Sequence, residues 1–444
     1  MPVAEAGSEP APPSDPRTLL RSRQYLVLLV LAALIGVPVS AAAFGFLALV
    51  GELQPLIYTD LPKALGFEGT PLWWPLPLLA VGGLLAGLSI QYLPGHGGHE
   101  PTAGFKAAGA PAPVELPGIF LAALATLCLA AVLGPEAPLL ALGAGLAAGA
   151  VRMVKRDPPE RVSAVLGATG SFAAVSSLLG SPLLGAFLLM EASGLGGVMM
   201  TTVLVPGLLA SGIGALIFVG LGSWSGLGTY SLALHDVPKA TPPTAAEFGW
   251  ALVIGLSAAF AGAGIRWLAV RLKTHVERRR VPATVVMGLV VAGLAIAYAE
   301  GTGKAATDVL YSGQTALDPF LRHHDAYSVG ALSLLVLCKG LAYCVSLSSF
   351  RGGPIFPAMF VGAAVGMLIS HLPGLSLVAG FAMGIGAMSA AMLRLPLVSV
   401  LLATLLIGAE GITVMPLVIV AVVVSYVATV RLTPLPAPEA GHPE

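Results

Sequence analysis

Long apolar stretches separated by short polar segments run along most of the chain. They cover residues 25–51, 73–93, 117–133, 137–152, 163–179, 182–193, 196–220, 246–272, 283–299, 330–346, 356–371, 373–393, 396–409 and 412–431. A helix needs about 20 apolar residues to cross a bilayer perpendicularly, and several of these stretches are much shorter. Because lipid cannot satisfy backbone polar groups, the short stretches must be half-helices or helices buried within protein. The pattern predicts an all-α polytopic membrane protein with broken and re-entrant helices.

The composition also points to a membrane. Hydrophobic residues make up 56% of the chain and charged residues 10%, and the mean hydropathy is +0.90. No soluble domain of this size would carry such a surface, so lipid must be the solvent. The net charge of zero argues against a nucleic-acid partner. The three cysteines lie in apolar runs without metal-like spacing, so we expect packing roles for them and no cofactor.

Basic residues predict the orientation. They gather in residues 17–23, 152–161 and 266–280 and at Arg431, whereas the loops 221–245 and 300–329 carry few. The positive-inside rule then places both termini in the cytoplasm, in a multi-pass protein of the plasma membrane. The apolar run after Arg23 is too long for a signal-peptide core, so we expect a retained first helix. Residues 1–16 are rich in Pro and Ala and should be disordered.

A short motif occurs twice, 219 positions apart, and suggests an internal repeat. The copies are Gly134-Pro135-Glu136-Ala137-Pro138 and Gly353-Pro354-Ile355-Phe356-Pro357. Each is followed at the same offset by a glycine, and residues 179–183 resemble residues 393–397 about 40 positions further on. We therefore predict a cytoplasmic tail (1–24), a first membrane half (25–220), an external linker (221–245), a second half (246–431) and a C-terminal tail (432–444).

Each copy of the motif should break a membrane helix and begin a new one, because Gly and Pro do not sustain regular helix. A third Gly-rich break is Gly95-His96-Gly97-Gly98. The exposed N–H groups of helix N-termini can replace the water around an anion near the bilayer midplane. We expect three such helix starts to converge on a small anion without any cationic side chain, because backbone amides bind weakly enough for throughput.

Glu136 stands inside the second break, among apolar and rigid residues. When ionised, its carboxylate would compete with an anion for the same amides, and when protonated it would swing away. This predicts a gate. The alternative is that Glu136 only caps a helix that faces external water.

These three breaks resemble the signature sequences of the CLC family of chloride channels and proton-coupled chloride transporters, over about residues 25–431. The resemblance implies two inverted halves, a homodimer with one pore per subunit, and chloride or a similar small anion as substrate. It implies that Glu136 is the gate. The implied anion-binding residues are Gly95, His96, Gly97, Gly134, Pro135, Ala137, Gly353, Pro354, Ile355 and Phe356.

The chain departs from the family pattern at the anion contacts. His96 takes the place of a serine, which would put a titratable imidazole beside the inner anion position; the alternative is a neutral His96 bonded to a backbone carbonyl. In the third break Ile355 takes the place of an aromatic residue. Pro354 has no N–H, so one of the usual amide contacts should be missing.

The family's internal proton relay also looks altered. Glu191 aligns with the first member of a Glu-Glu pair and Ala192 with the second, so only Glu191 remains for a possible proton pathway. The family's anion-facing tyrosine would fall at Pro436. The sequence leaves open whether the protein is a channel or a proton-coupled antiporter, and whether it carries chloride, fluoride or nitrate.

One remote alternative is an intramembrane metalloenzyme that uses His96, His99 and Glu100 as metal ligands. Gly97 and Gly98 disfavour the helix that such a motif needs. We therefore expect no catalytic residue and no resident metal. Lys339 and Arg394, in apolar surroundings, should snorkel or bond backbone carbonyls.

Overall fold

The computed structural model describes residues 21–104, 109–154, 160–176, 178–179, 181–193, 197–227 and 234–433. The α-helices are α2 (Arg23–Pro55), α3 (Leu61–Ala64), α4 (Pro75–Tyr92), α5 (Leu116–Cys128), α6 (Glu136–Val154), α7 (Glu160–Val175), α8 (Pro182–Ser193), α9 (Gly197–Ser225), α10 (Ala245–Arg278), α11 (Arg280–Thr302), α12 (Leu317–Arg322), α13 (Val329–Ser349), α14 (Ile355–Ile369), α15 (Leu377–Leu393), α16 (Pro396–Leu406) and α17 (Ala409–Leu432). Short turns are the π turn η1 (Leu56–Asp60) and the 3₁₀ turns η2 (Pro94–Gly97), η3 (Pro101–Ala103), η4 (Pro113–Glu115), η5 (Ala306–Asp308) and η6 (His324–Ala326).

The helix lengths confirm the predicted mixture of full spans and half-helices. Within the described ranges, seven helical segments are long and apolar enough to cross a membrane, and six further apolar helices have 10–17 residues. The first span, which begins at Arg23, packs against α9 and α7 as part of the core. Most of both predicted tails, together with Pro436, lies outside the described residues.

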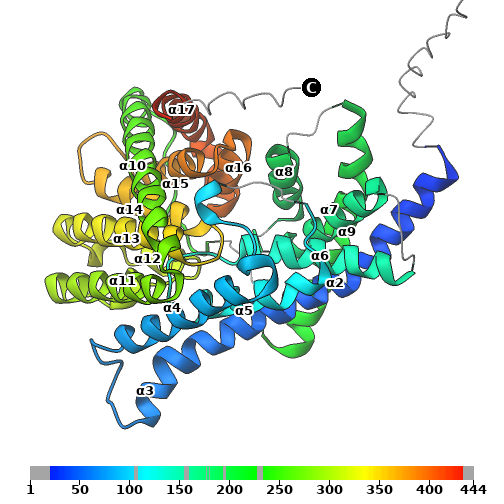
Figure 1. The fold of residues 1–444 in the computed structure, drawn as a ribbon. Helices are drawn as coiled ribbons and strands as arrows, with labels where there is room; N and C mark the ends of the chain where they lie inside the picture. The colour runs from blue at the N-terminus through cyan, green and yellow to red at the C-terminus, as the bar shows by residue number, and fades with distance from the viewer. Residues whose placement is uncertain are drawn as a thin grey trace, which may run out of the picture.

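The packing of the helices repeats between the two halves. In the first half α7 packs on α6, α2 and α9, and in the second half α15 packs on α14, α10 and α17 in the same way. The pairs α8–α9 and α4–α5 likewise have counterparts in α16–α17 and α11–α13. Figure 1 shows the first half, blue to green, on the lower and right side, and the second half, yellow-green to red, on the left. This pattern confirms two related halves; the boundaries at 220, 246 and 431 stay predictions.

The two copies of the motif bond directly to each other. The N–H of Gly134 donates to the carbonyl of Gly353 at 2.8 Å, and the N–H of Gly353 donates to the carbonyl of Gly134 at 2.6 Å. Equivalent residues exchange two antiparallel hydrogen bonds only when a two-fold axis passes between them. The axis that relates the two halves therefore passes between the second and third breaks.

Glycines allow the half-helices of each repeat to approach closely. A Cβ on Gly143 of α6 would lie 2.5 Å from the carbonyl oxygen of Gly170 on α7, and a Cβ on Gly362 of α14 would lie 2.2 Å from that of Gly384 on α15. The converse contacts are 2.2 and 2.1 Å. Gly143 and Gly362 therefore have a structural role, because nothing larger than hydrogen fits where the backbones cross.

Candidate anion site

The second and third breaks place two half-helix N-termini against each other. Helix α6 begins at Glu136 and helix α14 begins at Ile355, each two residues beyond a bridging glycine. The bridge holds these N-termini side by side, so their unpaired N–H groups open toward a shared space. The two-fold relation thus places both half-helix dipoles at one point inside the fold.

Glu136 occupies the space between these N-termini. Its side chain is fully buried, and its Oε1 accepts a hydrogen bond from the N–H of Ile355. The carboxylate also interacts with the N–H groups of Glu136 itself and of Phe356, while its Oε2 is buried without a hydrogen-bond partner. A Cβ on Gly353 would lie 2.0 Å from the Glu136 carboxyl carbon, so glycine is required beside it. The carboxylate therefore lies where a small anion could bind the same amides.

The third break presents amides of α14 to Glu136, and Pro354 itself has no N–H to add. Pro354 lies just before α14, and the N–H groups of Ile355 and Phe356 face the Glu136 carboxylate. The carbonyl of Pro354 accepts a hydrogen bond from the buried Tyr343 hydroxyl at 2.8 Å. The Tyr343 hydroxyl thus ties the third break to α13, and the missing amide contact at Pro354 stays a prediction.

The first break differs from the prediction of a third helix start. Its residues form the 3₁₀ turn η2, and the described chain continues into the three-residue turn η3 without an α-helix before residue 105. Residues 95–98 have φ values of +77°, +47°, +74° and +86°. His96 Nδ1 lies 3.1 Å from the carbonyl oxygen of Ile90. This bond is the one expected of a structural His96, and its role in anion binding stays a prediction.

A cationic side chain lies beside these breaks, which corrects the expectation of none. Arg351, just before the third break, is 4% exposed, and its Nε donates to the backbone carbonyl of His96 at 3.2 Å. Its Nη2 lies 3.6 Å from Glu100. Arg351 carries a visible signal in the sequence, because it is a single arginine directly before Gly352 in an otherwise apolar break.

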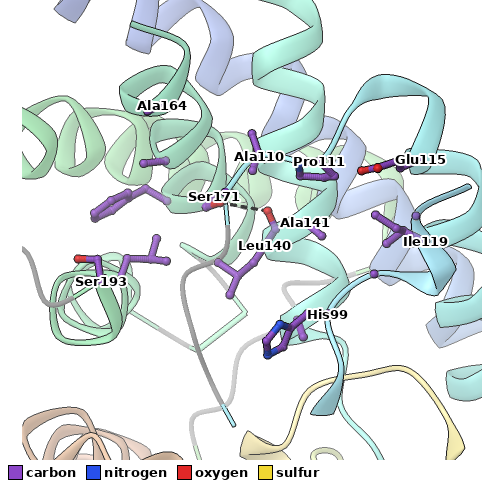
Figure 2. Close-up of a pocket in the computed structure, with 18 of the residues that line it drawn as sticks. His99, Ala110, Pro111, Glu115, Ile119, Leu140, Ala141, Ala164, Ser171 and Ser193 are labelled. Atoms are coloured by element: carbon purple, nitrogen blue, oxygen red, sulfur yellow. Dashed lines mark hydrogen bonds between the residues drawn. The ribbon is translucent and has the colours of Figure 1, made fainter. Parts of the chain in front are cut away.

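A cavity of about 750 Å³ extends from the first break to the second. It is lined at one end by His96, His99 and Glu115, and it reaches Ala137, the residue after Glu136. Figure 2 shows His99, Glu115, Ser171 and Ser193 around this cavity, with apolar side chains of α6 and α7 between them. The cavity thus extends from His96 to the residue after Glu136, and the Glu136 carboxylate itself does not line it.

Glu191 does not line this cavity. Its two carboxylate oxygens accept hydrogen bonds from the N–H groups of Leu397 and Val398, at 3.0 and 2.8 Å, across the boundary between the halves. A carboxylate at the first turn of α16 stabilises that helix end through its unpaired amides and dipole. Glu191 therefore has a capping role that the sequence did not indicate, and its proton-pathway role stays a prediction.

The residues of the metalloenzyme alternative are bound to other partners. His99 Nε2 lies 2.7 Å from the carbonyl of Gly104, and Glu100 pairs with Lys273 and Arg351. Within the described ranges, no three His, Cys, Asp or Glu side chains gather as a metal site would require. These partners give His99 and Glu100 structural contacts.

The two isolated cations also have specific partners. Lys339 is 1% exposed, and its ammonium donates to the carbonyls of residues 308–311 at 2.8 to 3.3 Å. The bonding of Lys339 to backbone carbonyls is thus confirmed. Arg394 instead donates to the Thr433 hydroxyl at 2.9 Å.

Half-helices that meet around a buried carboxylate, in a membrane fold of two inverted halves, define an ion channel or transporter. The family model described as voltage gated chloride channel matches residues 82–429. The chain therefore belongs to the voltage-gated chloride channel (CLC) family, as the resemblance predicted.

Curated relatives and solved structures agree with this assignment. An ion-transport protein, YfeO, from Salmonella schwarzengrund (strain CVM19633) is 28% identical over 360 residues, which are 79% of this chain and 82% of the relative. YfeO of Salmonella typhimurium (strain LT2) is 27% identical with the same coverage.

The solved structures share the fold. A slow cyanobacterial Cl⁻/H⁺ antiporter has a TM-score of 0.71 and 17% identity, and covers 91% of this chain and 94% of its own. A CLC-type fluoride/proton antiporter has a TM-score of 0.65 and 18% identity, with 90% and 95% coverage. The protein is thus a multi-pass membrane protein with a CLC fold.

Proposed function

We propose that this protein carries a small monovalent anion, most simply chloride, across the plasma membrane, and that Glu136 gates the pathway. The observation that carries the proposal is the buried Glu136 carboxylate, which accepts a hydrogen bond from the first residue of α14. A carboxylate held by helix N-termini acts as a tethered anion, so the amides that bind it would also bind a free one.

The surroundings of Glu136 support an exchange between carboxylate and substrate. Its Oε2 has no hydrogen-bond partner, and an unpaired buried oxygen costs about 1–3 kcal/mol. The bound carboxylate is therefore held incompletely and can leave. The cavity that begins at Ala137 gives an anion a route toward His96 and the cytoplasmic side.

Anion efflux from proteoliposomes tests the proposal. Vesicles loaded with chloride, nitrate or fluoride are diluted into anion-free buffer, and a potassium ionophore clamps the voltage. We expect efflux of at least one anion well above that from protein-free vesicles. Efflux no faster than from protein-free vesicles, for all three anions, would refute the proposal.

Proton coupling is a second question that the geometry bears on. Both oxygens of Glu191 are engaged by α16, and Ala192 carries no proton, so we propose that coupling is weak or uses another route. Uphill proton movement driven by a chloride gradient measures it. Strong coupling that Glu191→Gln abolishes would show that Glu191 is the relay after all.

We also propose a homodimer with one pore per subunit, which the family resemblance implies, with both termini in the cytoplasm, which the positive-inside rule predicts. Single-molecule photobleaching of labelled protein in sparse proteoliposomes counts the subunits directly. Two bleaching steps are expected.

A further inference from the structure

The loop of residues 95–98, here called the left-handed loop, needs outside support. All four of its residues have positive φ, and three of them are glycines that adopt this region freely. His96, at φ +47°, does not, and a left-handed residue with a side chain costs about 1–2 kcal/mol. The loop forms one end of the cavity that leads to Glu136, so whatever supports it also shapes that cavity.

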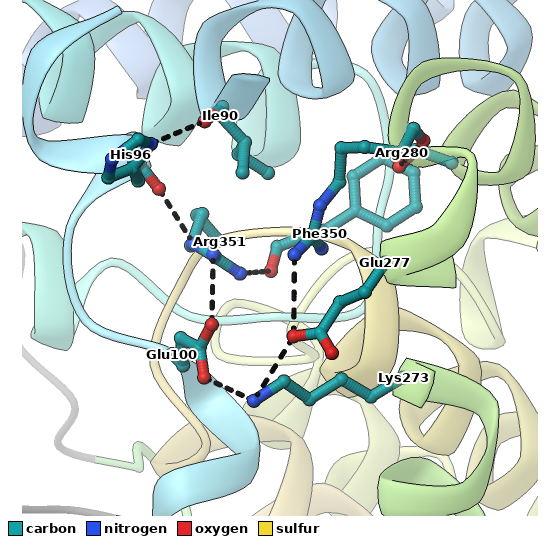
Figure 3. A network of polar contacts seen from close by, with 9 residues as sticks. Ile90, His96, Glu100, Lys273, Glu277, Arg280, Phe350 and Arg351 are labelled. Carbon is teal, nitrogen blue, oxygen red and sulfur yellow. Dashed lines mark hydrogen bonds and ion pairs between the residues drawn. The ribbon is translucent and has the colours of Figure 1, made fainter. Parts of the chain in front are cut away.

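Two of the contacts that support the loop come from its own half of the chain. His96 Nδ1 bonds the Ile90 carbonyl, and the N–H of Gly98 donates to the carbonyl of Gly95 at 2.8 Å. The third comes from the other half, where Arg351 Nε bonds the His96 carbonyl (Figure 3). The stem of Arg351 also packs against Gly97, since a Cβ there would lie 2.9 Å from the Arg351 Cγ.

The internal repeat shows that the break itself does not require an arginine. Val132 and Arg351 each lie two residues before a bridging glycine, and both are buried. The N–H of Val132 donates to the Ser346 hydroxyl of α13 at 3.0 Å, and the N–H of Arg351 donates to the Thr126 hydroxyl of α5 at 3.4 Å. The backbone contacts match, yet valine suffices in the first half. The guanidinium therefore serves something that only the surroundings of Arg351 provide, and the left-handed loop, which belongs to the first half, is what it touches.

A line of alternating charges anchors the buried guanidinium. Arg351 pairs with Glu100, Glu100 with Lys273, Lys273 with Glu277 at 3.5 Å, and Glu277 with Arg280 at 3.7 Å (Figure 3). Three cations and two carboxylates leave one positive charge in excess, at the corner between α10 and α11.

The Glu100 carboxylate, which anchors the Arg351 guanidinium, stays charged at physiological pH. Partial burial alone would raise the pKa of Glu100, but the hydrogen bond from Lys273 and the charges of Arg351, Lys273 and Arg280 outweigh it and lower that pKa below 4.5. A carboxyl group with a lowered pKa stabilises the folded state fully above pH 4.5. This stabilisation is lost only as the pH falls through the lower pKa of the folded state. The Arg351–Glu100 pair is therefore constant between pH 5 and 8.

We propose that Arg351 is a positioning residue for anion transport, which holds the left-handed loop against the third break. Its guanidinium fixes the His96 carbonyl, its stem supports Gly97, and Glu100 fixes the guanidinium. The consequence of this positioning for anion transport rests on the proposed function, whereas the effect of Arg351 on the loop does not.

Cysteine modification tests the loop directly and needs no transport. The native Cys128, Cys338 and Cys344 are buried, so they should not react with a water-soluble thiol reagent. A single His99→Cys substitution places a reactive thiol next to the loop, where it lines the cavity. The rate at which the reagent modifies this thiol then reports how firmly the loop is held. Arg351→Val installs the residue that the first half uses. In this variant we expect the thiol to be modified about tenfold faster, because a charge-assisted hydrogen bond to the loop is lost. Arg351→Lys should give a smaller increase. A lysine ammonium lacks the planar guanidinium that bonds the His96 carbonyl and Glu100 at the same time.

Controls and a second measurement complete the test. Arg322→Val removes a half-exposed guanidinium far from the loop in sequence and should leave the rate unchanged. If Arg351→Val does not fold, Arg351→Lys and Arg351→Gln take its place. In vesicles, Arg351→Val should raise the chloride concentration for half-maximal transport more than Arg351→Lys does. A modification rate within about twofold of the parent in the arginine variants would overturn the proposal, whether or not the protein transports anions.

Discussion

The two oxygens of the Glu136 carboxylate have different surroundings, and this difference suits a gate better than a cap. Oε1 accepts from the N–H of Ile355, which belongs to the other half of the protein, and Oε2 has no partner. A simple helix cap would bond only the N–H groups of its own helix, whereas the Glu136 carboxylate interacts with amides of both α6 and α14. Glu136 instead links two half-helices, so its departure would free the amides of both.

Replacing Glu136 by glutamine tests the gate. Glu136→Gln keeps the shape but removes the charge that competes for the amides, so anion efflux should become nearly independent of pH and any proton movement should stop. Efflux is measured in proteoliposomes from pH 4.5 to 7.5. Glu300→Gln, at an exposed position on α11, is the matched control and should behave like the parent. A parental pH profile in Glu136→Gln would favour the capping role.

Lys339 shows how a buried cation can be structural. Its three N–H donors are shared among the four consecutive carbonyls of residues 308–311, and its nitrogen lies 4.4 Å from the centre of the Phe360 ring. Lys339→Met would leave these carbonyls buried and unpaired, at a cost of more than about 3 kcal/mol. A clearly lower thermal unfolding temperature in detergent is expected, whereas Lys63→Met, at an exposed site, should change it little. Equal temperatures for the two variants would contradict this structural role.

At the scale of elements, glycines determine how closely α14 and α15 approach. The reciprocal contacts between Gly362 and Gly384 leave no room for a Cβ on either helix. Because α14 carries the amides that face Glu136 at its first turn, its position on α15 also fixes the candidate anion site. Packing at the middle of a half-helix thus sets the geometry at its end.

Substituting one of these glycines should separate the two helices. Gly362→Ala places a methyl group 2.2 Å from the Gly384 carbonyl oxygen, so we expect a loss of about 2 kcal/mol or more and slower transport. Gly340→Ala on α13 is the control, because nothing lies within 4 Å of its Cβ position. That change should be neutral or stabilising by up to about 1 kcal/mol. Unfolding temperature and efflux measure both variants, and equal behaviour would contradict the close packing.

At the scale of the whole molecule, the two-fold axis between Gly134 and Gly353 relates halves that carry opposite charge patterns. In the first half, basic residues precede the first span, α2; in the second half, they lie in the last turns of its counterpart α10, from Arg266 to Arg278, and at the start of α11. By the positive-inside rule α2 then begins, and α10 ends, on the cytoplasmic side. The two helices run in opposite directions, as inverted halves require.

Sided labelling of cysteines tests this orientation. Lys239→Cys lies before α10 and Thr274→Cys lies near its end, and both positions are exposed. A membrane-impermeant thiol reagent added to intact cells should label Lys239→Cys only, and Thr274→Cys should react after the membrane is opened. Labelling of Thr274→Cys in intact cells would reverse the predicted topology.

The sequence by itself determined the membrane class, the two related halves and the position of Glu136. These features rest on local properties: apolar length decides whether a segment can lie in lipid, and Gly and Pro decide where a helix breaks. For the same reason the sequence predicted a helix start at the first break that the structure does not show. Gly residues mark where a helix ends, but they do not determine whether another helix begins there.

Only the tertiary structure decided which groups meet at those breaks. Ile355 reaches Glu136, Arg351 reaches His96 and Glu191 reaches Leu397, and each pair joins residues from different halves of the chain. No local pattern encodes such a contact, because it depends on how two independently folded layers of helices pack about their common axis.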